Sequence, residues 1–283
     1  MKYWIIALVL VVLAAVAWYL YQQDTAETPE PDVPVPALAE PAVEAMPQAA
    51  TPPVTEPVAP APMLEPEPVV EEPQLPALGE SDPEVLEALQ GLAGPDYPVT
   101  AYVVEEDVIS RAVATVDALG GKQVPGSIQV VQGPGGEFQA TDDQQPDNVI
   151  RNDLGDVIPQ YRLDPANYAR YTPYVDMLDA MEPDAIVATY RSWEPLFEEA
   201  FGQLGYPDAD FTDRLRSLID ELLATPEPQG PVRLIKPEAY YLFADEDLES
   251  LTAGQKILLR MGPENAARVK ARLREIRAAL AAP

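Results

Sequence analysis

The sequence predicts a mainly α-helical protein, formally α+β because a minor β-hairpin or strand is also expected. Three observations predict its organisation. Residues 3–21 are an unbroken apolar run, residues 22–80 are crowded with proline and acidic residues, and residues 81–283 carry apolar side chains at helical spacing. We therefore expect a transmembrane helix within residues 1–21, a disordered proline-rich tether at 22–80 and a helical domain at 81–283.

The apolar run reads YWIIALVLVVLAAVAWYLY and contains no charge over its 19 residues. At about 1.5 Å per residue it spans about 28 Å, close to a bilayer core of about 30 Å. Aromatic residues stand at both ends, where the membrane interfaces lie. These features favour an uncleaved signal-anchor. A cleaved signal peptide, suggested by Ala15-Val16-Ala17, and a buried core helix are the alternatives.

Charges around the run predict its orientation. Lys2 precedes it, whereas Asp24 and Glu27 follow it. The positive-inside bias then places the N-terminus in the cytoplasm. We expect a single-pass protein of the inner (cytoplasmic) membrane, held through residues 3–21, with its C-terminal domain in the periplasm. A scaffold that faces the cytoplasm would need the reverse topology.

The tether contains 15 prolines, 12 acidic residues and no Lys or Arg. Such a composition does not bury enough apolar surface to fold, and proline and like charges extend the chain. We interpret the tether as a spacer. A docking site for a proline-recognising module or a basic partner is the alternative.

The first part of the domain combines helices with an irregular region. Ser81 is expected to cap a helix, since proline follows within the first turn. The predicted elements are helices at 82–90 and 105–119 and a loop at 141–156. Between them, residues 127–131 and 137–140 flank Gly133-Pro134-Gly135-Gly136 and are expected to form either a hairpin or a mobile excursion.

The second part of the domain is more regularly helical. Pro195 is expected to kink or split one helix, and Pro237 restricts the best strand candidate to an edge or a bend. The predicted elements are helices at 164–181, 183–204, 211–222, 245–251, 255–261 and 264–280, and a strand at 232–243.

Composition excludes several classes of function. The chain has 47 acidic and 18 basic residues, so its net charge of −29 argues against nucleic acid and anionic lipid surfaces as partners. It contains no Cys and no His. Disulfides, thiolate metal sites and Ser-His-Asp or Cys-His catalysis are therefore impossible. We expect no enzyme and no cofactor.

The basic C-terminal helix is the first candidate site, because residues 256–283 carry seven basic and two acidic residues. Lys270 and Arg274 are expected to point away from the apolar stripe that includes Val269 and Leu273. The candidate partner-binding residues are Arg268, Lys270, Arg272, Arg274 and Arg277. An exposed basic face would suit an anionic partner. The alternative is that these charges pair with the acidic body or are simply solvated.

Three further groups are considered as sites, and each has a structural interpretation that we favour. Aromatic residues at helical spacing are expected in the core, the acidic runs are too abundant to indicate glycoside cleavage, and a loop rich in Asp lacks the EF-hand spacing. The groups are Tyr168, Tyr171, Tyr174, Tyr190, Trp193 and Phe197; Glu105, Glu106, Asp107, Asp245, Glu246 and Asp247; and Asp142, Asp143, Asp147, Asp153 and Asp156. Residues 133–136 lack the Lys-Ser/Thr of a phosphate loop and are expected to form a turn.

Several stretches of the domain resemble the bacterial family called domain of unknown function 3014. They include VEEDVISRAVATVDAL at 104–119, YRLDPANYARYTPYVDMLDAM at 161–181, AFGQLGYP at 200–207 and RLRSLIDELLATPEP at 214–228, and the most distinctive is YYLFADEDLESLTAGQKILLRMGPENAARVKARLREIR at 240–277. The resemblance covers most of residues 81–283. It implies an anchored envelope protein, and it implies no reaction and no catalytic residue.

Together these features predict a non-enzymatic adaptor, or interaction domain, that is held on a long tether and docks on an unknown envelope protein. The alternative is a cell-wall glycan-binding module or a hydrolase that uses carboxylates.

Overall fold

The computed structural model describes residues 75–143, 149–152 and 154–282. It confirms a mainly helical fold with a small β-sheet. The helices are α3 (Asp82–Ala93), α4 (Val108–Leu119), α5 (Ala166–Ala180), α6 (Pro183–Leu204), α7 (Phe211–Leu223), α8 (Glu246–Glu249), α9 (Ala253–Arg260) and α10 (Gly262–Ala281), with 3-10 turns at Leu78–Glu80, Val99–Ala101 and Gly126–Ile128.

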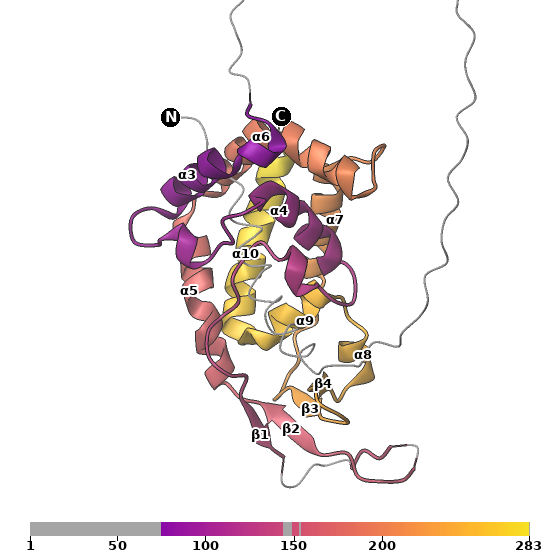
Figure 1. Ribbon diagram of the computed structural model, residues 1–283. Coiled ribbons are helices and arrows are strands. Elements are labelled where there is room, and N and C mark those ends of the chain that lie inside the picture. Colours follow the sequence, from indigo (N-terminus) through magenta and orange to yellow (C-terminus); the bar gives the residue numbers. More distant parts are fainter. Residues whose placement is uncertain (1–74, 144–148, 153, 283) are drawn as a thin grey trace, which may run out of the picture. The chain divides into compact units, whose positions relative to one another are not determined.

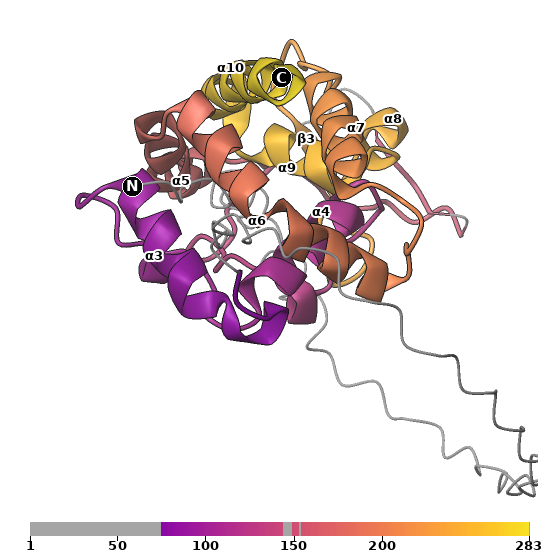
Figure 2. The same ribbon diagram turned by 90° about the horizontal axis from the view of Figure 1, so that it is seen from above.

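The C-terminal helix α10 is central to the helical part (Figure 1). It packs against α5, α6, α7 and α9, while α4 packs against α6 and α7. Seen from above, α6 runs between α10 on one side and α3 on the other (Figure 2). Residues that are distant in the sequence thus surround the helix that carries most of the candidate basic side chains.

Apolar stripes explain this packing. On α10, Val269, Leu273 and Ile276 are buried as predicted, and on α7 Leu215 and Leu218 are buried. They belong to one large core cluster of the helices. The helix at 183–204 is continuous through Pro195, so the predicted split is wrong.

Four short strands form one antiparallel sheet in the order β1-β2-β3-β4. They are β1 (Ala140–Asp142), β2 (Gln160–Leu163), β3 (Arg233–Ile235) and β4 (Leu242–Phe243). The sheet lies at one end of the helices (Figure 1). Leu163, Val232, Leu234, Phe243 and Leu259 form a second, smaller core cluster there.

The predicted hairpin around residues 133–136 is wrong. Ala140 pairs with Leu163, and Val131 makes an isolated bridge to Val103. Val130 and Val131 are buried in the helical core, which holds them away from residues 137–140. Part of the predicted loop at 141–156 is therefore strand β1.

The predicted strand at 232–243 is in fact two strands. Leu234 on β3 pairs with Phe243 on β4. Pro237 lies between them, because proline has no N–H to give to a sheet and is favoured at such a bend.

The start of α3 differs from the expected cap. The Ser81 hydroxyl donates to the carbonyl of Leu78 at 2.7 Å and does not cap the helix. The neighbouring Asp82 instead accepts hydrogen bonds from the backbone N–H groups of Asp107 at 2.8 Å and Val108 at 2.9 Å. One carboxylate at the start of α3 thus satisfies the first turn of α4.

The predicted membrane anchor, and the tether as far as residue 74, lie outside the described residues. Among the helices that the structure does describe, none is both long enough and apolar enough to cross a membrane. Leu75 and Leu78, assigned by sequence to the end of the tether, pack against the helical core.

Candidate functional site

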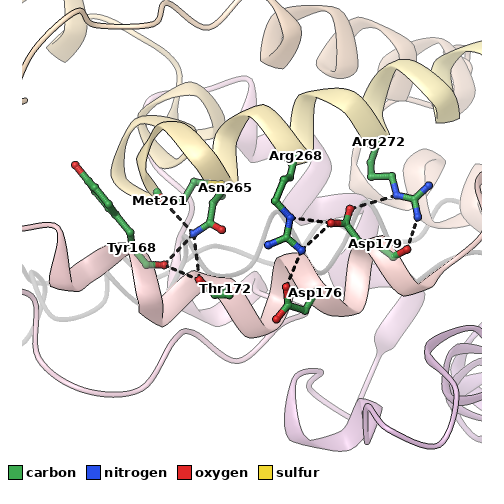
Figure 3. Close-up of polar contacts among 8 residues, drawn as sticks. All are labelled: Tyr168, Thr172, Asp176, Asp179, Met261, Asn265, Arg268 and Arg272. Carbon is green, nitrogen blue, oxygen red and sulfur yellow. Dashed lines mark hydrogen bonds and ion pairs between the residues drawn. The ribbon is translucent and has the colours of Figure 1, made fainter.

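Two of the candidate partner-binding residues on α10 contact acidic residues of α5 (Figure 3). Arg268 donates to Asp176 Oδ1 at 2.6 Å and to Asp179 Oδ2 at 2.8 Å. Arg272 donates to the other oxygen of Asp179 at 3.3 Å and also to its backbone carbonyl. The hydrogen bond to Asp176 raises the pKa of Arg268 above its ordinary value. These two cations therefore hold α5 and α10 together.

A buried amide continues this contact toward the start of α10 (Figure 3). Asn265 donates from Nδ2 to the carbonyl of Tyr168 at 2.9 Å and to that of Met261 at 3.1 Å. Tyr168 lies in the first turn of α5, and Met261 lies between α9 and α10. Asn265 therefore fixes the corner between α9 and α10 against α5.

The remaining cations face other neighbours. Arg277 Nε lies 2.5 Å from Asp220 Oδ1 on α7. Arg274 is exposed, and within the described part of the chain it makes no hydrogen bond or ion pair. The basic side chains predicted to share one face are therefore divided between α5, α7 and solvent.

Lys270 is the clearest departure from expectation. Its side chain was expected to point into solvent, yet the residue is only 4% exposed. Its Nζ donates to the carbonyl of Thr225 at 2.6 Å and to Glu227 Oε1 at 2.8 Å. Both acceptors belong to residues 225–232, which link α7 to β3 and which we call the strap.

The reason for this error is geometric. At about 100° per residue, Lys270 lies roughly 90° from the centre of the apolar stripe, on the flank of the helix. When only helical spacing is considered, a side chain on the flank of the helix is predicted to face solvent. The strap covers this flank, so the prediction that Lys270 points away from the body is wrong.

The strap closes one side of a cavity of about 380 Å³. This volume is at the small end of the range of roughly 300–1,000 Å³ that ligand pockets occupy. Besides strap residues 225–232, the lining comprises Tyr168 of α5, Leu258 and Leu259 of α9, and Gly262, Pro263, Ala266, Ala267 and Lys270 of α10. The walls are mostly apolar, and Lys270 is the cation in the lining.

The ion pair at this cavity is asymmetric. The Lys270 side chain is 5% exposed, whereas that of Glu227 is 73% exposed. The hydrogen bond from Lys270 lowers the pKa of Glu227 below its ordinary value, so Glu227 stays ionised. An ammonium has three donors, and two of them have partners among the described residues. The arrangement can therefore accept a further oxygen ligand.

A sequence model of the family described as "Protein of unknown function (DUF3014)" matches residues 108–277. The match covers 170 of the 283 residues. The chain belongs to the DUF3014 family. No curated protein and no solved structure matches it. The DUF3014 match includes the strap, Lys270 and the whole lining of the cavity.

Within the DUF3014 region, most of the candidate aromatic residues belong to the core. Tyr171, Tyr174, Tyr190, Trp193 and Phe197 are buried in the helical cluster. Burial raises the pKa of Tyr174 to about 12. Tyr168 is half-buried and lines the cavity. The preference for core over a stacking site is thus confirmed for all but Tyr168.

The acidic candidates remain at the surface. Glu105, Glu106 and Asp107 precede α4 and are exposed. The second run, which begins at Asp245, is also exposed, and Asp245 caps α8 by accepting from the N–H of Asp247 at 2.9 Å. These runs lie at helix starts, where carboxylates are favourable.

The Asp-rich loop does not assemble a metal site in the described residues, which contain no group of three or more potential ligands. Asp143 is buried and pairs with Arg162 at 2.6 Å. Asp147 and Asp153 lie outside the described residues. The chain bends at Gly135 and Gly136, and the carbonyls of Pro134, Gly135 and Gly136 accept hydrogen bonds from Arg170.

Sequence reasoning missed the strap and its cavity. Their residues come from α5, α9, α10 and a segment without regular structure, so no local spacing joins them. One signal was available, because three prolines occur within residues 226–231 directly after the strongest apolar stripe. Such a run marks a segment that crosses a surface without joining a sheet.

Proposed function

We propose that this protein is a non-enzymatic adaptor of the cell envelope. Residues 3–21 would anchor it in the cytoplasmic membrane as a single pass, and the domain described above would bind a partner outside the cytoplasm. The anchor part of the proposal is supported by the length, lack of charge and flanking aromatic residues of the apolar run.

The observation that carries the binding part is the cavity beneath the strap. Apolar walls with one buried cation are a recognition geometry, because the walls supply affinity and the charge fixes orientation. The lysine shares its charge only with an exposed carboxylate. A ligand that offers an oxygen acceptor and a small apolar group is complementary to such a site.

Tethering makes a small site sufficient. A module held near its partner by a flexible link binds with an effective concentration set by the link. A cavity of about 380 Å³ can hold only a short segment of a partner. A weak contact of this size is useful to a membrane-held adaptor and less so to a freely diffusing one.

In-cell photo-crosslinking tests the proposal. A probe at Ala267, exposed and in the lining of the cavity, is compared with a probe at Ala278, exposed near the end of the same helix. We expect a discrete protein adduct from Ala267 alone. Equal labelling at both positions, or adducts with cell-wall polymer only, would count against the adaptor.

A topology reporter tests the location separately. A C-terminal fusion to an enzyme that is active only outside the cytoplasm should be active in cells. Silence of that reporter, with the fusion present in the membrane fraction, would reverse the orientation and contradict an envelope partner.

A further inference from the structure

A sequence similar to that of the strap occurs a second time in the chain, near its start. Residues 225–232 read TPEPQGPV, and residues 28–35 read TPEPDVPV. Six of the eight positions are identical. They are the Thr-Pro-Glu-Pro tetrapeptide and the Pro-Val pair at the end, and the two differences lie side by side in between.

The identical positions include those by which the strap contacts Lys270 and the small core cluster. The carbonyl of Thr225 and the carboxylate of Glu227 accept from Lys270. Val232 is buried in the small core cluster beside the sheet. The three prolines line the cavity. Residues 28–35 therefore carry the equivalents of Glu227, of the three prolines and of Val232. Gln229 and Gly230, which also line the cavity, are replaced by Asp32 and Val33.

The two differing positions tolerate the exchange. Gly230 does not have a positive φ, and a Cβ placed there would meet nothing within 4 Å, so the Val33 of the second copy of the motif fits that position. The side chain of Gln229 bonds only to the carbonyl of Glu227 within the strap. Asp32 at the equivalent position would therefore give up no hydrogen bond to the rest of the domain.

The middle of the strap is also held weakly. Residues 226–231 are exposed, and among the described residues no backbone hydrogen bond joins them to another element. Glu227 is itself mostly exposed, so water can replace its contact with Lys270. A second segment of the same sequence can therefore compete with it for the ammonium.

We propose that residues 28–35 of one copy of the chain bind at the cavity of a second copy, where Glu30 takes the place of Glu227 on Lys270. Charge favours the exchange, because the incoming segment carries two carboxylates, Glu30 and Asp32, where the strap carries Glu227 and the neutral Gln229. The positive charge of the exposed Arg274 acts on Glu227, and it would attract these carboxylates as well. The middle of the strap, residues 226–231, then moves aside while its two buried ends, Thr225 and Val232, stay in place. Glu30 and the prolines of the incoming segment replace their counterparts, and Thr28 and Val35 do not replace Thr225 and Val232.

The choice of a second copy rests on the proposed membrane anchoring. Copies in one membrane are concentrated near each other, and a reciprocal exchange makes two contacts at once. Two weak contacts formed together give an affinity that a single one does not. The exchange would link neighbouring adaptors through their membrane-proximal segments.

The lack of cysteine in the chain allows a direct test with the full-length protein in its membrane. One copy carries Asp32→Cys, and the other carries Ala267→Cys at the mouth of the cavity. Under a mild oxidant we expect this mixed disulfide dimer to form several-fold faster than a control dimer in which Ala45→Cys takes the place of Asp32→Cys. Adding Glu30→Gln to the Asp32→Cys chain should lower the rate to that of the Ala45→Cys control, whereas Glu40→Gln should not.

Three outcomes would overturn the inference. They are equal rates for the cysteines at positions 32 and 45, a rate unaffected by Glu30→Gln, and a disulfide that forms only within a chain that carries both cysteines. All substitutions at positions 30, 32, 40 and 45 leave residues 75–282 unchanged, so a folding defect of the domain does not explain a loss. An active topology reporter without cross-links contradicts this inference alone, whereas a silent reporter contradicts the proposed function.

Discussion

A lysine that is 4% exposed, and that pairs with a carboxylate lying mostly in solvent, is an unusual element of a fold. A buried charge costs desolvation, and replacing it with an apolar side chain of similar shape is often neutral or stabilising. Lys270 therefore contributes to stability less than its burial suggests. The recognition role that we propose for the cavity would account for its placement.

This reasoning predicts the effect of Lys270→Met. The methionine keeps the apolar stem, and water in the cavity can satisfy the Thr225 carbonyl. We expect the free energy of unfolding, measured by urea denaturation, to fall by less than about 1 kcal/mol or to rise. The exposed Arg274→Gln is the control and should change it by less than about 0.5 kcal/mol. A loss above about 2 kcal/mol in Lys270→Met would show a structural role for the ammonium.

A second prediction concerns the partner of this lysine. The hydrogen bond from Lys270 holds the pKa of Glu227 below its ordinary 4.5. A depressed pKa in the folded state means that the ion pair contributes fully above about pH 4.5, and that its contribution is lost as the pH falls through the folded pKa. An NMR titration of the Glu227 carboxyl should give a midpoint below 4.5. In Lys270→Met the midpoint should rise, and an unchanged midpoint would contradict the ion pair.

Residue placement shows where sequence reasoning succeeds and where it stops. The buried stripe of α10 follows from spacing, since Val269, Leu273 and Ile276 recur on one face. The partners of Arg268 and Lys270 do not follow from it. They lie on α5 and on the strap, which are 89–92 and 43–45 residues away in the chain.

At the scale of elements, the corner between α9 and α10 depends on one glycine. Gly262 has a φ of +84°, which other residues adopt at a cost, and a Cβ there would lie 2.5 Å from the ring of Tyr168. Both the backbone and the close approach therefore require glycine. The same ring lines the cavity, so the corner also sets the shape of the candidate site.

Gly262→Ala should consequently destabilise the domain. Strain in the left-handed region costs about 1–2 kcal/mol, and displacement of the Tyr168 ring adds to it. Thermal unfolding followed by circular dichroism should show a clearly lower Tm. Gly230→Ala is the matched control, because nothing lies near its Cβ and its φ is not positive, and its Tm should stay close to that of the parent chain. Equal losses in both variants would contradict the role assigned to the corner.

Helices and strands differed in how far local sequence predicted them. The helices after 164, 183 and 211 follow from apolar spacing and from start signals such as Pro183, and the structure has them close to the expected bounds. The sheet was missed in part, because its strands are two to four residues long and β2 pairs with β3 some 70 residues later. Pairing over that distance leaves no periodic trace in so short a segment.

At the scale of the whole molecule, charge is unevenly distributed. Residues 81–255 carry 33 acidic and 10 basic residues, whereas residues 256–283 carry seven basic and two acidic residues. The helix with the basic excess lies against α5 and α7, which supply Asp176, Asp179 and Asp220 as its partners. The basic helix thus offsets part of the repulsion within an acidic body.

This distribution makes the response to salt informative, because two effects oppose each other. Raising ionic strength from about 0.01 M to about 0.15 M shortens the Debye length from about 30 Å to about 8 Å. Screening weakens ion pairs such as Arg277–Asp220, but exposed pairs contribute no more than about 1 kcal/mol each. Screening also reduces repulsion across a chain with a net charge of −29. We expect the second effect to be larger, so that Tm rises with added salt.

Removing exposed acidic residues distinguishes this explanation from a specific effect of the ions. Glu105→Gln combined with Glu106→Gln lowers the repulsion without touching the ion pairs of α10, since both glutamates are exposed ahead of α4. The double variant should have a higher Tm than the parent chain at low salt and a smaller rise when salt is added. If Tm instead falls with salt in both proteins, the ion pairs between α10 and its neighbours outweigh the repulsion. The basic helix would then be the main electrostatic support of the fold, and its arginines would have little freedom to engage an anionic partner.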